Sequence, residues 1–144
     1  MPARVLVPFD DSESARDALE YAIDLFPDGE FVVLTVADTS TLPFIPNSAT
    51  DDDEAVQEAL DDLFGDIDQR LSIPETVAEE RDVPIETRTR IGSPAQEIIE
   101  FADAESIDHV VMGSRGRSGV KRILLGSVAE VVVRHSSVPV TVVH

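Results

Sequence analysis

The sequence of 144 residues contains no cysteine, which excludes disulfides, thiol catalysis and cysteine metal sites. It has no apolar run of the roughly 18 or more residues that a membrane span requires. Its first apolar stretch, residues 5–7, is too short for the core of a signal peptide. We therefore expect a protein of the cytoplasm that has no membrane partner.

Basic residues are also scarce. The chain has 11 Lys and Arg against 29 Asp and Glu, a formal net charge of −18, and Lys121 is the single lysine. This excess of acid suits a well-solvated surface, and it also suits a salt-rich cytoplasm, where a Debye length of about 3 Å at molar salt screens carboxylate repulsion. Under either interpretation we expect no nucleic-acid partner, because most of this surface would repel phosphates.

Apolar, β-branched stretches alternate with helical periodicity along the whole chain. The pattern predicts strands at residues 5–9, 31–36, 85–91, 109–112 and 138–143, with helices between them. The alternating stretch 85–91 is expected near a sheet edge. Strands separated by helices imply right-handed parallel crossovers. The chain is therefore predicted to form one α/β domain over residues 1–144.

Three helix signals stand out within this pattern. Residues 93–96, Ser-Pro-Ala-Gln, have the form of a capping box with proline at the first helical position. Pro74 is expected to break or kink the helix that opens at the acidic run 51–54, with helical structure continuing to about Arg81. Ser127 is expected to cap the last helix.

The segment 113–127, GSRGRSGVKRILLGS, carries the strongest chemical signal. It joins an apolar strand to a helix, and its glycines allow the main chain to approach a ligand closely. Residues 113–126 hold four of the 11 basic residues and no acid. A helix N-terminus and a local basic patch both favour a bound anion. The alternative is that the glycines are ordinary turn residues and the bases merely solvate the loop.

Three stretches make the chain resemble the universal stress protein family over essentially its full length. They are residues 5–12 (VLVPFDDS), the spaced glycines of 113–127, and residues 137–143 (SVPVTVV). The spaced glycines are typical of the nucleotide-binding branch. The resemblance implies a doubly wound, open sheet of five parallel strands in the order 3-2-1-4-5, of the adenine nucleotide alpha hydrolase-like type, with helices on both faces. It also implies ATP as the ligand, with Mg²⁺ arriving on the phosphates.

In that strand order the winding reverses between strands 1 and 4, and ligands of open α/β sheets bind at such a point. By resemblance, three groups of residues form the nucleotide site. Gly113, Arg115 and Gly116 line the ribose and phosphates; Gly126, Ser127 and Val128 hold the phosphates; and Pro8, Asp10, Val36 and Met112 surround the adenine and ribose. Core packing is the alternative for Val36 and Met112, and a helix cap is the alternative for Asp10. Thr35 departs from the family, whose members often have histidine before the valine.

The resemblance also implies a homodimer formed by antiparallel pairing of the last strand. Residues 138–143 are apolar, and an unpaired apolar edge is an aggregation hazard; an edge covered by the chain's own C-terminal residues is the alternative. We expect a regulatory ATP-sensing protein of the stress response. The alternatives are a slow ATPase or phosphotransferase using the same loop, and a dimeric scaffold with an empty pocket. No catalytic residue is predicted, because His109, His135 and His144 all lie outside the loop.

Overall fold

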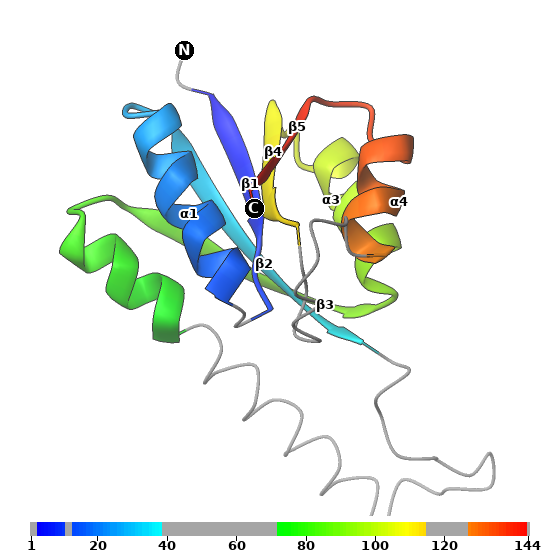
Figure 1. Cartoon of the computed structure of the whole chain (residues 1–144), viewed down its shortest axis with the longest axis horizontal. Helices are drawn as coiled ribbons and strands as arrows, with labels where there is room; N and C mark the ends of the chain where they lie inside the picture. The colour runs from blue at the N-terminus through cyan, green and yellow to red at the C-terminus, as the bar shows by residue number, and fades with distance from the viewer. Residues whose placement is uncertain (1–2, 11–12, 39–71, 115–126, 144) are drawn as a thin grey trace, which may run out of the picture.

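The computed structural model describes residues 3–10, 13–38, 72–114 and 127–143 (Figure 1). Five parallel strands form one sheet in the order β3-β2-β1-β4-β5, which confirms the predicted topology. The strands are β1 (Arg4–Pro8), β2 (Glu30–Asp38), β3 (Ile85–Gly92), β4 (His109–Gly113) and β5 (Val140–Val143).

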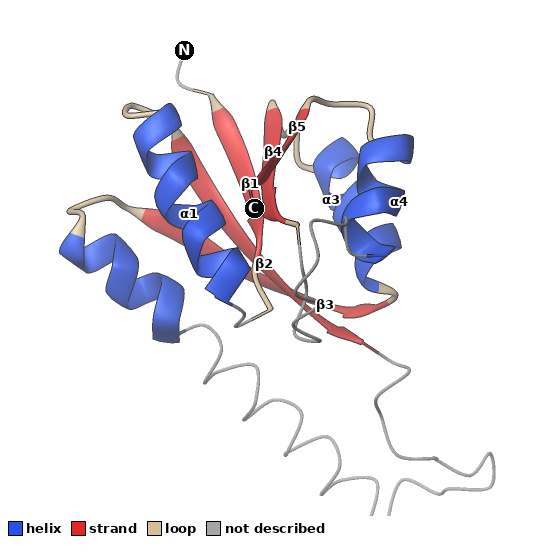
Figure 2. Ribbon diagram, viewed as in Figure 1, coloured by secondary structure: helices blue, strands red, loops and turns tan. Residues whose placement is uncertain are grey.

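Helices cover both faces of the sheet, as predicted (Figure 2). Helix α1 (Glu13–Leu25) and the helical residues 72–80 pack on one face, and α3 (Pro94–Ala104) and α4 (Ser127–His135) pack on the other. Strand alternation divides the core accordingly: Val5 and Val7 of β1 join the α1 cluster, and Leu6 joins the α3/α4 cluster. Burial on both faces explains why the central strands are continuously apolar.

The start of α3 differs in detail from the capping box. Ser93 is the N-cap residue and Pro94 occupies the first turn, as predicted, and the Glu97 amide donates to the Ser93 carbonyl at 2.9 Å. The Ser93 side chain, however, makes no capping hydrogen bond. Gln96 donates instead to Glu100 at 2.8 Å. The predicted boundary was therefore right and the reciprocal side-chain bonds were wrong.

Strand β5 begins at Val140, two residues later than predicted. The cause is a turn: the Ser136 hydroxyl donates to the Val138 carbonyl at 2.9 Å and accepts from the Val138 amide at 3.1 Å. Both main-chain groups of Val138 are thus engaged before the strand starts. Elsewhere, residues 72–80 are helical and include Pro74, in line with the expected stretch to about Arg81; the segment before residue 72 lies outside the described residues.

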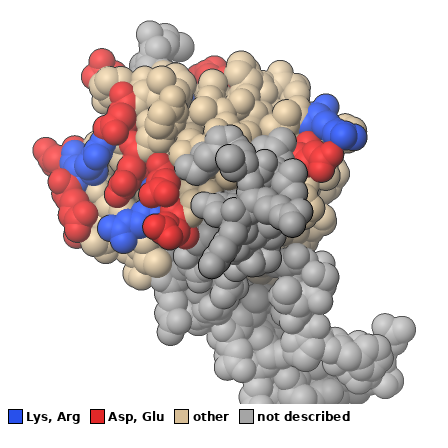
Figure 3. Space-filling model, viewed as in Figure 1, with Lys and Arg blue, Asp and Glu red and all other residues tan. Residues whose placement is uncertain are grey.

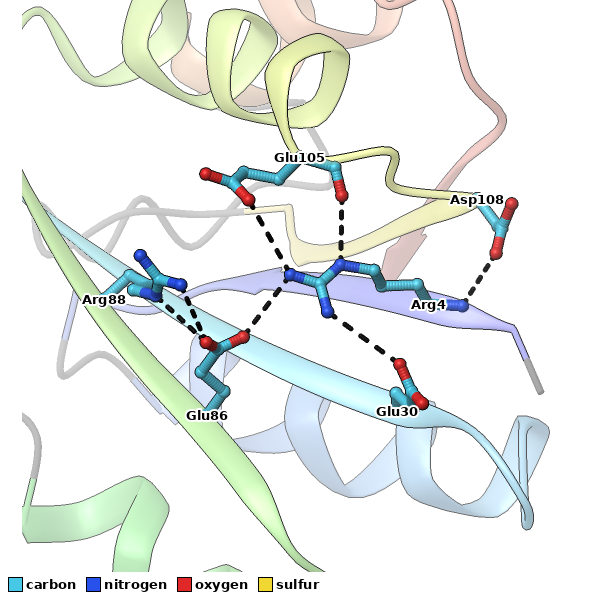
Figure 4. Close-up of polar contacts among 6 residues, drawn as sticks. All are labelled: Arg4, Glu30, Glu86, Arg88, Glu105 and Asp108. Atoms are coloured by element: carbon cyan, nitrogen blue, oxygen red, sulfur yellow. Dashed lines mark hydrogen bonds and ion pairs between the residues drawn. The ribbon is translucent and has the colours of Figure 1, made fainter.

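A charge network ties the amino ends of the strands together (Figure 4). The Arg4 guanidinium donates to the Glu105 carbonyl at 3.0 Å and to Glu86 at 3.4 Å, and it lies 3.8 Å from Glu30. Glu86 also accepts from Arg88 at 2.8 Å. This hydrogen bond from Arg88 holds the pKa of Glu86 below its ordinary value. Burial acts in the opposite direction, and the charges of Arg88 and Arg4 lower the pKa further.

Candidate functional site

The site expected from the sequence lies where the winding of the sheet reverses, between β1 and β4. These strands pair at only two positions, Val5 with His109 and Leu6 with Val110. By contrast, β2 and β3 pair at eight positions, over the full length of β3. The carboxyl-terminal residues of β1 and β4 therefore lie beyond the stretch in which these two strands pair with each other. This is the place at which open α/β sheets take ligands.

Three of the predicted adenine-site residues share one face of the sheet at this end. Pro8, Val36 and Met112 lie on adjacent strands β1, β2 and β4, each at an even position that alternation directs toward α3 and α4. Val36 is half-buried and Met112 is 5% exposed, and both belong to the apolar layer under α3 and α4. The structure brings these residues to one end of one face, and core packing accounts for part of their burial.

Asp10 lies two residues beyond the end of β1. The Phe9 amide donates to the Leu34 carbonyl at 2.8 Å, which extends the contact with β2 one residue past Pro8. Phe9 is buried, and Asp10, next along the chain, is half-buried. The end of the strand therefore delivers a carboxylate to the rim of the switch point. The cap alternative for Asp10 involves residues 11 and 12, which lie outside the described residues.

Gly113 ends β4, and its lack of a side chain has a packing reason that the sequence did not reveal. A Cβ at this position would lie 2.8 Å from the main-chain carbon of Ser14 and 2.9 Å from its Cβ. Helix α1 therefore crosses the end of β4 at a distance only glycine permits. The next residue, Ser114, is buried, and its amide donates to the Val143 carbonyl of β5 at 2.9 Å. Ser14 gave no signal in the sequence beyond its helical position.

The phosphate end of the expected site is described only in part. Helix α4 begins at Ser127, which is exposed, and Val128 packs against the apolar layer under α3 and α4. The start of this helix thus lies on the face that carries Pro8, Val36 and Met112. The predicted residues Arg115, Gly116 and Gly126 lie outside the described residues.

The other chemically reactive groups lie elsewhere. His109 begins β4, at the opposite end of that strand from Gly113, and its Nε2 lies 2.6 Å from the Thr141 hydroxyl while its ring contacts Phe26. Burial lowers the pKa of His109. A hollow of about 470 Å³ lies between residues 75–79 and 82–85, and Glu75, Glu79 and Asp82 line it. Its charge would repel a nucleotide.

The described residues hold neither a cluster of metal ligands nor a membrane-spanning helix. In those ranges no three or more His, Asp and Glu side chains gather closely enough to hold a metal ion. No helix within them is both long and apolar enough to cross a membrane.

Comparison with known proteins gives a consistent result. The model of the universal stress protein family matches residues 1–144. The sequence is 37% identical over 142 residues to universal stress protein MJ0531 of Methanocaldococcus jannaschii, covering 97% of this chain and 81% of that protein. Among solved structures, the MJ0577 protein gives a TM-score of 0.76 at 30% identity, with 99% and 96% of the two chains covered. A universal stress protein solved in complex with cAMP gives 0.71 at 27% identity, with 99% and 97% covered.

Proposed function

This chain belongs to the universal stress protein family, and from that membership we propose that it binds an adenine nucleotide, ATP with Mg²⁺ on its phosphates, at the carboxyl ends of β1 and β4. The observation that carries the proposal is the short ladder between these strands, two positions against eight for β2 and β3. Beyond these two positions the ends of β1 and β4 are not paired with each other, and this is the point at which open α/β sheets take ligands.

The apolar and polar parts of the switch point suit the two halves of a nucleotide. Pro8, Val36 and Met112 offer an apolar surface for the base, and Asp10 follows at the rim, where a ribose hydroxyl can donate to it. The basic glycine segment after Gly113 and the amino end of α4 at Ser127 favour the phosphates. The cAMP complex of a relative 27% identical supports an adenine nucleotide as the class of ligand.

We further propose that the protein acts as a regulatory, nucleotide-sensing homodimer joined through β5 rather than as an enzyme. In the described ranges, the two histidines that could act as a base, His109 and His135, lie at the start of β4 and the end of α4. Both positions are at the amino end of the sheet, opposite the switch point. A group must lie within hydrogen-bond reach of the reacting atoms to serve as a general base.

The proposal is tested by calorimetric titration with Mg-ATP, AMP and cAMP in molar KCl. Ser127→Asp places a carboxylate at the first residue of α4. A negative charge there suits the helix dipole, so the fold should hold while nucleotide binding falls by at least tenfold. Ser93→Asp is the matched control, because it adds the same charge at the amino end of α3, beside the edge strand β3. Undiminished binding by Ser127→Asp, or no heat with any of the three nucleotides, would contradict the proposal.

A further inference from the structure

The arginines of the described ranges are of two kinds. Five of the six lie beside a carboxylate, namely Arg4, Arg16, Arg81, Arg88 and Arg134. Over the described part of one face, Figure 3 shows basic side chains next to acidic ones, as these ion pairs require. The sixth, Arg90 of β3, pairs with no carboxylate of the described residues. In a chain with 29 acidic residues, this exception needs a physical reason.

The contacts of Arg90 hold its guanidinium in place without neutralising it. Its Nη1 donates to the Thr89 carbonyl at 3.1 Å, and its guanidinium carbon lies 5.1 Å from the centre of the Phe101 ring. The face of an aromatic ring attracts a guanidinium and makes no use of its N–H groups. Arginine has five such donors, of which the described residues engage one. Arg90 is therefore equipped to donate to a further acceptor.

Arg90 lies in register with the proposed base site. Val36 of β2 pairs with Arg90 of β3, and both are at even positions, which face α3 and α4. Val36 and Phe101 belong to the same apolar layer. Because neighbouring strands lie about 4.8 Å apart, Arg90 leaves the main chain one strand spacing from Val36, on the same face of the sheet.

The same row continues to Asp10 on the other side of Val36. Strand β1 pairs with β2 as far as Leu34, and the Phe9 amide donates to the Leu34 carbonyl at 2.8 Å. Asp10 is two residues past the end of β1, and Val36 is two residues past Leu34, so the two lie near one level. Asp10 and Arg90 therefore flank Val36, each about one strand spacing away.

This row suits a nucleotide that lies across the strand ends. In the proposed function the phosphates lie at the start of α4, the ribose lies at Asp10 and the base lies on Val36. The next strand beyond β2 in the sheet is β3. The edge of the base that points away from the ribose is thereby directed toward Arg90. A purine carries ring nitrogens that accept hydrogen bonds from arginine.

We propose that Arg90 binds the base of the nucleotide: its guanidinium, held against Phe101, donates a hydrogen bond to a ring nitrogen of the adenine. This inference rests on the nucleotide site proposed above and adds a residue to it that the family resemblance did not supply. A hydrogen bond from a charged donor strengthens binding by about tenfold. Arg88, two residues earlier on the same face, is already engaged by Glu86.

The contact is tested by calorimetric titration in molar KCl with ATP and with its two halves. Adenosine has the base without phosphate, and inorganic triphosphate has the phosphates without a base. Arg90→Leu should weaken ATP and adenosine by the same factor, about tenfold, and leave triphosphate unchanged. Arg88→Leu is the matched control, because it removes the same charge from the same face of β3, and it should leave all three unchanged. A loss that grows with the charge of the ligand would overturn the contact with the base.

The accepting atom is identified with the 1-deaza and 7-deaza analogues of ATP, each of which replaces one ring nitrogen by C–H. The wild type should bind one of these analogues about tenfold more weakly than ATP. Arg90→Leu should bind that analogue and ATP equally, because the hydrogen bond is already lost. A purely structural role of Arg90 would instead weaken all three ligands alike. Losses that simply add for both analogues overturn the hydrogen bond.

The outcomes separate this inference from the proposed function. No binding of ATP by the wild type contradicts the nucleotide site itself. Equal affinity of the wild type and Arg90→Leu for ATP leaves that site and overturns the role of Arg90. Thermal unfolding without ligand checks that the variant is folded. If Arg90→Leu is unfolded, Arg90→Met takes its place, because an unbranched apolar side chain can still cover Phe101.

Discussion

Gly113 is the residue for which the structure and the sequence offer different reasons. The sequence explains it as a point of close approach to a nucleotide. The structure shows α1 packed against it, because a Cβ at Gly113 would lie 2.8 Å from the main-chain carbonyl carbon of Ser14. Its φ is not among the positive ones in the described residues, so the constraint is space and not backbone conformation. Gly113→Ala should therefore move α1.

The expected cost is that of overpacking, about 1–3 kcal/mol in the free energy of unfolding. For a chain of this length that corresponds to a fall of about 3–10 °C in Tm, measured by calorimetry without nucleotide. The double variant Ser14→Gly/Gly113→Ala removes the clash with the Ser14 Cβ but keeps the main-chain contact. A double-mutant cycle subtracts the effect of Ser14→Gly alone on the free energy of unfolding. After that subtraction, the double variant should recover only part of the stability that Gly113→Ala loses.

One result would refute the packing explanation of Gly113. If Gly113→Ala melts at the wild-type temperature and yet loses nucleotide binding, the glycine serves the ligand and the packing argument is wrong. A lowered Tm with binding retained at a temperature well below it would show that α1 alone requires the glycine.

Three further predictions follow from buried or networked polar groups. The buried hydroxyl of Thr35 has no hydrogen-bond partner in the described structure, so Thr35→Val should raise the unfolding free energy by about 1 kcal/mol in urea titrations; a loss of stability would reveal a partner. Arg4→Gln should cost about 1–2 kcal/mol, against less than about 0.5 for Arg16→Gln, whose ion pair with Glu20 is exposed. Burial lowers the pKa of His109 from 6.5, so its neutral form is favoured on folding: stability should be unaffected above that pH and fall below it, and His109→Gln should lack this part of the decline.

Much of the fold was predictable because the signals are local and repeated. Five apolar stretches separated by helical patterns determine a parallel sheet, and the alternating charges of β3 indicated an edge. The errors arose where the chain had a competing local choice. Val138 engages Ser136 in a turn, so β5 starts later, and Gln96 bonds forward to Glu100, so the capping box does not close. Such choices between nearby partners differ by little free energy and leave no trace in periodicity.

The location proposed for the site follows from the sequence, and the packing contacts around it do not. Residues that follow strands 1 and 4 must meet once the strand order is known, so Asp10 and Gly113 could be placed together from the sequence. The contact between Ser14 and Gly113 could not, because it depends on how α1 crosses the sheet. Tyr21 and Leu25 of α1 are 45% and 44% exposed. Their exposure was hidden for the same reason, since a helix pattern alone does not say which side of the helix a neighbour leaves uncovered.

Charge links the two proposals. A chain with a net charge of −18 repels its own copies, so the proposed self-association should use a stretch without charged residues, and β5, with the sequence VTVV, is such a stretch. Salt screens the repulsion between the copies but does not weaken apolar contacts. The dimer dissociation constant should therefore fall as KCl rises toward molar concentration, when measured by sedimentation. An interface held by ion pairs would show the opposite slope, and that slope would mean that the two copies do not meet through β5.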